Sequence, residues 1–163
     1  MKELLIVYHS LTGGARQMAE AAQRGALADG GVRVRLIHAR EATGRHVIEA
    51  DGYLFVTPEN LAAMAGMMKD FFDRTYYQAL ERIEARPYAT LVCAGSDGHN
   101  AVRQIDRICN GWRLTRVAEP IIVCTHAQTP EKILAPKRIS ADDLRRCEEA
   151  GAALAAGLAL GVF

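Results

Sequence analysis

Residues 4–14 read LLIVYHSLTGG, an apolar run followed by a loop that contains two hydroxyl side chains and two adjacent glycines. A short, continuous apolar run of this kind is typical of a β-strand that is buried on both faces. After Gly13 the pattern changes to a helical period, with Met18 and Ala22 on one face. The stretch therefore predicts a strand, a short loop and a helix, which is the repeating unit of an α/β protein.

The same alternation continues along the rest of the chain. Strand-like runs recur at residues 32–37, 53–56, 89–94 and 120–124, and helix-like segments lie at 13–29, 45–50, 61–77, 100–110 and after Ser140. We expect Pro58 to end the third strand and Asn60 to be available as an N-cap for the following helix. Five strands alternating with helices predict a parallel sheet covered on both faces. No repeat or linker interrupts the pattern, so a single domain over residues 1–163 is expected.

The composition excludes several classes of function. Of the 163 residues, 50% are hydrophobic and 24% are charged, and the net charge is +1, so there is no electrostatic footprint for nucleic acid. No apolar stretch is long enough to suggest a membrane span. The four cysteines form no C-x-x-C pair and are expected to be buried free thiols, which suits a reducing cytoplasm. The five histidines are scattered without metal-ligand spacing.

The loop after the first strand has the composition of a phosphate-binding turn. In an open α/β sheet, ligands bind outside the carboxyl ends of the strands. This loop offers the hydroxyls of Ser10 and Thr12, two glycines and the free N–H groups of a helix start, and these groups suit an anion. The alternative is a plain strand-to-helix turn that happens to contain two glycines.

Two later loops follow strands at the same edge of the sheet. Residues 57–61, TPENL, place amide and carboxylate groups beside apolar side chains, a mixture that a flat heteroaromatic ring requires. Residues 95–98, GSDG, offer backbone N–H groups and little steric bulk. The first of these can also be a proline turn before a helix, and the second an ordinary flexible turn.

Three parts of the chain resemble flavodoxin-like proteins. The pattern Ser10-x-Thr12-Gly13 resembles the flavodoxin phosphate loop, and the GSDG loop at 95–98 matches the position of a third flavin loop. Residues 57–60 together with AGMMKDFFDR at 65–74 resemble a signature of NAD(P)H-dependent FMN reductases and flavodoxin-like quinone reductases. The resemblance covers nearly the whole chain. It implies a three-layer flavodoxin-like α/β fold with a five-stranded parallel sheet, order 2-1-3-4-5, and helices on both faces.

The resemblance also implies an FMN site. The first loop would hold the phosphate, residues 58–61 would line the isoalloxazine ring and the ribityl chain, and residues 95–98 would close the other side of the ring. The candidate cofactor-binding residues are Ser10, Leu11, Thr12, Gly13, Gly14, Ala15, Pro58, Glu59, Asn60, Leu61, Gly95, Ser96, Asp97 and Gly98. Two features depart from the family pattern. Ala15 stands where the family often has a hydroxyl, and no Trp or Tyr occupies either ring loop.

From these features we expect a cytoplasmic NAD(P)H-dependent FMN oxidoreductase that reduces flavin, quinone or a similar small electron acceptor. Two alternatives remain open: a flavodoxin-type electron carrier, and a flavodoxin-fold module that binds without turnover. A net charge of +1 gives little of the single-sign field that small carriers use to steer partners. No residue is assigned a catalytic role and no metal site is expected, because the chemistry would belong to the cofactor.

The helix expected at 61–77 is rich in methionine and aromatic residues. At 100° per residue they cannot all face one core, and Met67 and Tyr77 should point partly outward. This favours a homodimer or larger homo-oligomer through that helix, although the helix can also be embedded between the sheet and the loops. The loop at 125–139 is a candidate lid or nicotinamide route, or a plain surface connection.

Overall fold

The structure is a computed structural model that describes residues 1–163. Its strands are β1 (Glu3–Tyr8), β2 (Arg33–His38), β3 (Gly52–Asn60), β4 (Ala63–Met64), β5 (Pro87–Ala94), β6 (Thr115–Arg116) and β7 (Ile121–Cys124). Its helices are α1 (Gly14–Leu27), α2 (Gly44–Glu49), α3 (Gly66–Ala79), α4 (His99–Gly111), α5 (Pro130–Leu134) and α6 (Ala141–Leu160). Strands and helices alternate along the chain, as the apolar runs predict.

The central sheet has the order β2-β1-β3-β5, and two short strands share the next position. β6 pairs with the first residues of β5, and β7 pairs with its last four. Every pairing along this path is parallel. The predicted order 2-1-3-4-5 is therefore confirmed, with a fifth strand that is split in two. When β6 and β7 are counted separately and β4 is included, the sheet has seven strands rather than five.

The end of β3 differs from the prediction. β3 continues to Asn60, and Pro58 remains in register with Cys93 of β5. Pro58 lies beyond Val56, the last residue of β3 that pairs with β1, at a sheet edge where proline is tolerated. The expectation that Pro58 ends the strand is wrong.

β3 and β4 form an antiparallel hairpin whose turn is Leu61-Ala62. Both turn residues have positive φ, 51° and 63°, as a tight two-residue hairpin turn requires. The helix therefore begins at Gly66 after the N-cap Ala65, and Asn60 does not cap it. The predicted helix at 61–77 is displaced to 66–79. The turn has no glycine or asparagine, so its sequence carries none of the usual hairpin signal.

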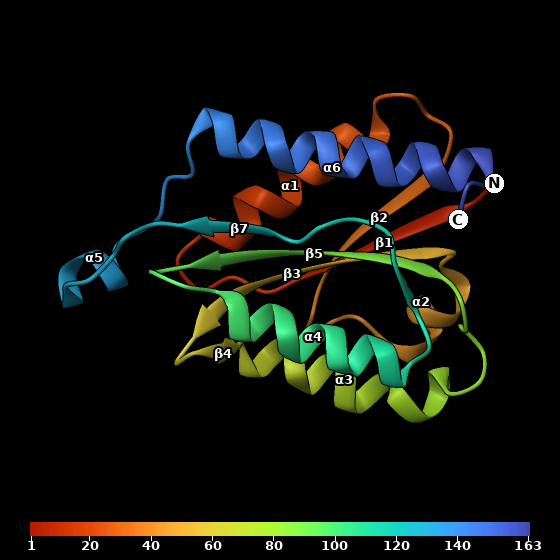
Figure 1. Cartoon of the computed structure of the whole chain (residues 1–163), viewed down its shortest axis with the longest axis horizontal. Helices are drawn as coiled ribbons and strands as arrows, with labels where there is room; N and C mark the ends of the chain where they lie inside the picture. The colour runs from red at the N-terminus through yellow and green to blue at the C-terminus, as the bar shows by residue number, and fades with distance from the viewer.

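Helices cover both faces of the sheet in three layers (Figure 1). α1 and α6 pack on one face around a core that includes Ile6 and Leu54, and α2, α3 and α4 pack on the other around Phe55 and Phe71. Trp112 is buried in the second core, with its ring 5.3 Å from that of Phe72. β2 is only partly buried along its length, which confirms its place at an edge.

α1 and α6 approach each other backbone to backbone. A methyl group at Gly25 of α1 would overlap the carbonyl oxygen of Glu148, and one at Gly151 of α6 would overlap that of Ala22. Ser140 caps α6 by accepting a hydrogen bond from the Asp143 N–H at 3.1 Å. The first and last helices of the chain are thus held together by a contact that only glycine permits.

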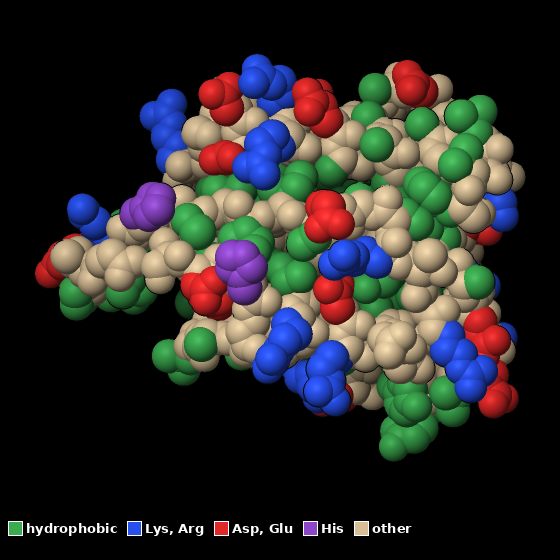
Figure 2. Space-filling model, viewed as in Figure 1, with side chains coloured by type: hydrophobic (Ala, Val, Ile, Leu, Met, Phe, Trp, Pro, Cys, Tyr) green, Lys and Arg blue, Asp and Glu red, His purple; other side chains and the backbone are tan.

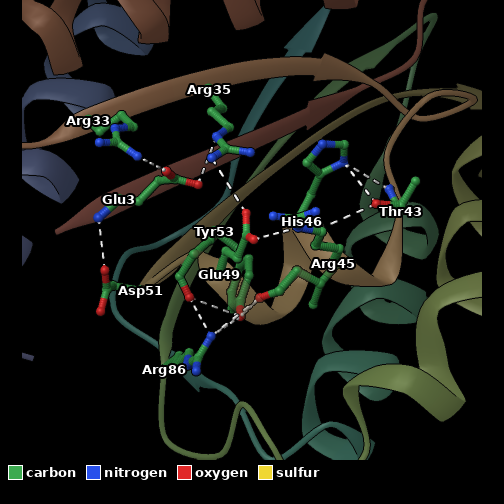
Figure 3. Close-up of polar contacts among 12 residues, drawn as sticks. Glu3, Arg33, Arg35, Thr43, Arg45, His46, Glu49, Asp51, Tyr53 and Arg86 are labelled. Atoms are coloured by element: carbon green, nitrogen blue, oxygen red, sulfur yellow. Dashed lines mark hydrogen bonds and ion pairs between the residues drawn. The ribbon is translucent and has the colours of Figure 1, made fainter.

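The amino end of the sheet carries a paired polar network (Figure 3). Glu3 is nearly buried and forms an ion pair with Arg35 at 3.0 Å, while Asp51 pairs with Lys2 at 2.9 Å. The Arg86 guanidinium donates to the carbonyl oxygens of Val47, Ile48 and Ala50 at the end of α2, and to the Tyr53 hydroxyl. These contacts fix α2 and the starts of β1, β3 and β5 to one another.

All four cysteines are free thiols. Cys93, Cys109 and Cys147 are buried as expected, whereas Cys124 is partly exposed at the end of β7. No group of three or more metal-ligating side chains comes together. None of the helices combines the length and the apolar composition needed to cross a bilayer.

Candidate functional site

A cavity of about 510 Å³ lies at the carboxyl ends of β1, β3, β5 and β7. Its volume falls within the usual range for small-molecule sites, about 300–1,000 Å³. The residues that line it are Ser10, Leu11, Thr12, Gly14, Ala15, Pro58, Glu59, Asn60, Leu61, Cys93, Ala94, Gly95, Ser96, Thr125, Ala127, Gln128, Ile133, Leu134 and Lys137. The three loops selected from the sequence therefore meet at one cavity. Eleven of the fourteen candidate residues line it, that is, all except Gly13, Asp97 and Gly98.

The first loop delivers the uncapped start of α1 to this cavity. The N-cap Gly13 has φ 97°, a left-handed conformation that favours glycine, and no side chain caps the helix. The Ser10 hydroxyl accepts a hydrogen bond from the Gly13 N–H at 3.1 Å, which holds the loop in its turn. The next N–H groups, of Gly14 and Ala15, lie at the positive end of a 14-residue helix. This arrangement suits an anion at the first loop.

The second loop is the β3–β4 hairpin, and it is held against the third loop and α4. The Glu59 carboxylate accepts a hydrogen bond from the Gly98 N–H at 2.7 Å. Asn100 donates to the Ala62 carbonyl at 2.6 Å, and Gln104 accepts from the Met64 N–H at 2.9 Å. The hairpin is thereby fixed, although the Leu61 side chain at its tip is fully exposed.

The third loop contributes less to the cavity than the sequence predicts. Gly95 and Ser96 line the cavity, but Gly98 is buried outside it and gives its N–H to Glu59. Asp97 is directed to His99, whose Nδ1 lies 2.5 Å from the Asp97 carboxylate, and this contact lowers the pKa of Asp97. The Asp97–His99 pair is exposed and is not part of the cavity lining.

The wall between the first and third loops is apolar and unreactive. Cys93 is buried there, and burial raises the pKa of its thiol to about 11, so it is protonated at neutral pH. A methyl group at Gly14 would lie only 2.5 Å from the Cys93 Sγ, so a larger residue here would require Cys93 or the loop to shift. A protonated thiol beside alanines has no nucleophilic role. The site is therefore equipped to bind and orient a ligand rather than to attack one.

The segment after β7, which the sequence marks as a candidate lid or nicotinamide route, supplies cavity residues that are not among the fourteen candidates. Thr125, Ala127, Gln128, Ile133, Leu134 and Lys137 all line the cavity from this 125–139 segment, which contains the short helix α5. Figure 2 shows hydrophobic side chains at the outer ends of α5 and of the β3–β4 hairpin. The strand order points to these residues: β7 is parallel to β5, so the loop after β7 must emerge at the same edge of the sheet as the other three loops.

Two histidines that are far apart in sequence meet beside the first loop. His9 Nδ1 lies 3.2 Å from His38 Nε2, at the ends of β1 and β2. Burial lowers the pKa of each imidazole, and the neighbouring charge of Arg40 acts in the same direction. The Arg40 N–H donates a hydrogen bond to His38 Nδ1, so the neutral His38 carries its proton on Nε2. This Nε2–H donates a hydrogen bond to His9 Nδ1. The apparent scatter of the histidines does not predict this pair.

A family model described as NADPH-dependent FMN reductase matches residues 38–129. The chain belongs to this family. The matched region contains β3, the hairpin, α3, β5, the third loop and β7. It therefore includes two loops of the cavity and the first residues of the 125–139 segment, but not the first loop. No Trp or Tyr lines the cavity of this chain.

Two curated relatives align with part of the chain. A flavodoxin of Aquifex aeolicus is 40% identical over 45% of this chain and 40% of its own length. An NAD(P)H dehydrogenase (quinone) of Acidithiobacillus ferrooxidans is 34% identical over 46% of this chain and 48% of its own length. The chain thus spans less than half of the length of each relative.

Solved structures match over nearly the whole chain. A flavodoxin from the domain Archaea has a TM-score of 0.77 at 20% identity and covers 96% of this chain and 98% of its own. A flavodoxin-type WrbA-like protein from Agrobacterium tumefaciens has a TM-score of 0.73 at 18% identity, with 99% of both chains covered. At these identities the likeness concerns the fold alone, and it confirms the predicted flavodoxin-like architecture.

Proposed function

We propose that this chain is an FMN-binding flavoprotein that uses NAD(P)H to reduce flavin, quinone or a similar small electron acceptor. One observation carries the proposal: a loop suited to an anion and two loops suited to a flat ring meet at a single cavity of about 510 Å³. The chain's membership of the NADPH-dependent FMN reductase family supports it. The continuous sheet and its two cores support a single domain.

The groups at the cavity fit FMN. The phosphate would lie at the start of α1, where the N–H groups of Gly14 and Ala15 have no capping side chain and the hydroxyls of Ser10 and Thr12 are adjacent. The ring and the ribityl chain would lie between the first loop, the hairpin at 58–61 and the third loop at 95–96. When bound, FMN supplies the hydride and electron transfer, and the protein binds and orients it.

The rim of the cavity is apolar and open to solvent. The side chains of Leu11, Leu61 and Leu134 line the cavity and are 78%, 101% and 75% exposed. No aromatic side chain lines the cavity, so none covers the ring face there. An apolar, open rim suits a nicotinamide or quinone ring, which would displace water from these leucines.

The decisive experiment has two steps. The purified protein is mixed with FMN and desalted, and its visible spectrum is recorded; we expect the flavin bands to remain with the protein. The loaded protein is then mixed anaerobically with NADH or NADPH in a stopped-flow instrument, and the bands should bleach. Retention of FMN without bleaching by either nucleotide would contradict the reductase, and a colourless protein would contradict the FMN site.

A flavodoxin-type electron carrier is the second candidate. The relative from Aquifex aeolicus that is named a flavodoxin favours it, as does the exposed apolar rim, on which a protein partner can dock. The net charge of +1 argues against it. A carrier would retain FMN and exchange electrons with a chemical reductant, but NADH and NADPH would leave its flavin bands unchanged.

We also propose that the chain forms a homodimer or larger homo-oligomer through α3 in the cytoplasm. A groove of about 410 Å³ between α3 and α4 is lined by Phe72, Tyr76, Tyr77 and Trp112 among others, and Tyr77 is 82% exposed. Both helices lie on the outer surface of one layer (Figure 1). Light scattering should give at least twice the monomer mass, and Tyr77→Glu should lower it; a monomer mass for the unaltered protein would rule out the assembly.

A further inference from the structure

The 125–139 segment is attached to the first loop on both sides of Lys137. The Lys137 N–H donates to the Thr12 carbonyl at 2.8 Å. The Gln17 amide donates to the Lys137 carbonyl at 2.7 Å and accepts from the Ile139 N–H at 3.0 Å. Gln17 also donates to the Gly13 carbonyl at 3.0 Å, so one side chain of α1 joins the first loop to this segment. The backbone of Lys137 is therefore held beside the uncapped start of α1.

The ammonium group of Lys137 lies at the same place. Its Nζ donates to the Thr12 Oγ1 at 3.2 Å and to the carbonyls of Ile133 and Ala135 at 2.7 Å each. All three acceptors are neutral oxygens, and Lys137 is absent from every ion pair of the chain. Lys137 is half-buried and lines the cavity. A cation without a counter-ion thus faces the loop that is suited to an anion.

The local electrostatics favour an anionic partner for this lysine. The first turn of α1 contains no acidic residue, and its N–H groups form the positive end of the helix. The neutral acceptors of Lys137 do not neutralise its charge, so an ammonium beside a positive helix end is stabilised further when a negative charge is added. In addition, Ala15 gives this loop one hydroxyl fewer than the related phosphate loops, so the loop alone offers fewer donors.

We propose that Lys137 is a phosphate-binding residue, which donates from the 125–139 segment to the flavin phosphate held at the first loop. This inference rests on the proposed FMN site and extends it. The Nζ exchanges one of its neutral acceptors for a phosphate oxygen, and the lysine charge neutralises part of the phosphate charge. The missing hydroxyl at residue 15 is thereby replaced by a stronger donor that comes from another part of the chain.

The test compares FMN with riboflavin, which has the same ring but no phosphate. Dissociation constants of both flavins are measured by fluorescence quenching for the unaltered protein, Lys137→Met, Lys137→Arg and Lys132→Met. Lys137→Met should weaken FMN about 10- to 100-fold, as expected for a charge-assisted hydrogen bond, and change riboflavin affinity less than about threefold. Lys137→Arg should recover most of the loss. Lys132→Met, which removes an exposed charge from α5, should leave both affinities unchanged.

The possible outcomes separate this inference from the proposed function. Equal weakening of FMN and riboflavin by Lys137→Met would show that the lysine only holds the 125–139 segment in place, and would overturn the proposal. Unchanged FMN affinity would overturn it as well, while leaving the FMN site intact. If the unaltered protein binds riboflavin and FMN equally or binds neither, the phosphate site itself is absent and both proposals fail. Circular dichroism of each apo variant checks that the fold is retained.

Discussion

The two ends of the sheet are built in opposite ways. At the amino end, Glu3, Asp51 and Arg86 all have partners, and the last carbonyls of α2 receive hydrogen bonds from one guanidinium (Figure 3). At the carboxyl end, α1 begins without a cap and Lys137 has no counter-ion. Several large apolar side chains, Leu61 among them, are exposed at that end.

Because of this difference, the polar groups at the amino end mainly stabilise the fold, and the groups at the carboxyl end are available to a ligand. A paired polar group already has its partner, so it stabilises the fold and offers nothing to a ligand. An unpaired donor or an exposed leucine contributes little to the fold, but it can interact with a molecule that arrives from solution. Substitutions that remove the uncapped or exposed groups at the carboxyl end should therefore change ligand affinity more than stability, and substitutions in the paired network at the amino end should do the reverse.

The largest expected effect concerns binding at the carboxyl end. Gly13→Asp places a carboxylate at the start of α1, and like charges about 4 Å apart at an effective dielectric of about 20 repel by about 4 kcal/mol. FMN affinity should fall at least a hundredfold, measured by fluorescence titration. Gly13→Asn is the matched control, because it has the same shape and the same positive φ of 97° without the charge. If both variants lose affinity equally, backbone strain rather than charge is responsible.

The second effect concerns stability at the amino end. Arg86→Met removes the charged donor from the carbonyls at the end of α2, and such hydrogen bonds contribute about 1.5–3 kcal/mol. Urea unfolding should therefore show a loss of about 2–3 kcal/mol, with FMN affinity unchanged. Arg45→Met removes an exposed partner of Glu49 and should leave the urea unfolding curve almost unchanged. A change in the FMN affinity of Arg86→Met would contradict the expectation that the amino end of the sheet affects stability and not binding.

A smaller effect is expected from backbone strain at the hairpin tip. Ala62 has φ 63°, which is unfavourable for an alanine and not for a glycine. Ala62→Gly should therefore raise the free energy of unfolding by about 0.5–1 kcal/mol. Ala63→Gly, one residue later in β4, should lower it by a similar amount because no strain is relieved there. Differential scanning calorimetry of the two variants measures both shifts, and shifts of the same sign would contradict the strain.

The smallest effect is a dependence of stability on pH at the carboxyl end. The folded protein holds the pKa values of His9 and His38 below their usual value of 6.5, so the unfolded chain binds protons more readily. Their contribution to stability is present above about pH 6.5 and is lost as the pH falls toward the folded values. Glu41, which raises the pKa of His38, opposes part of this effect.

We expect the melting temperature to fall by only a few degrees between pH 7.5 and pH 5.5 on account of this pair. His38→Asn should reduce that fall, because it removes one of the two groups that resist protonation. His46→Asn, a histidine at the N-terminal end of α2, serves as the control for a change of one imidazole elsewhere. A pH dependence that is identical in all three proteins would exclude the His9–His38 pair as its origin.

Local patterns of the sequence predict most of the sheet and three walls of the cavity. Continuous apolar runs identify β1, β3 and β5, and loops with glycines and hydroxyls after them mark the rim. The β3–β4 hairpin is not predicted, because its turn residues Leu61 and Ala62 carry no turn signal and adopt positive φ under tertiary constraint. The contacts of Glu59 with Gly98 and of Asn100 with Ala62 supply that constraint.

For the fourth wall, the 125–139 segment, the sequence suggests a lid or a nicotinamide route, but it does not predict which residues of the segment reach the cavity. Lys137 reaches the cavity only because Gln17 and Thr12 bind the 125–139 segment, and these partners lie 120 and 125 residues away in the chain. Hydrophobic periodicity relates residues that are close in the chain, so it cannot predict such a contact. The same holds for His9 and His38, which meet because β1 and β2 are neighbours in the sheet.

The glycine contact between α1 and α6 has a consequence for protein synthesis. The buried face of α1 packs partly on the sheet and partly on α6, and the contact through Gly25 and Gly151 joins two helices that lie far apart in the chain. A nascent chain that lacks α6 exposes the part of α1 that α6 covers to water, so α1 is then held by the sheet alone. The anion subsite at the start of α1 therefore depends on a helix that is encoded much later in the chain, and during synthesis it is fully supported only once α6 has been made.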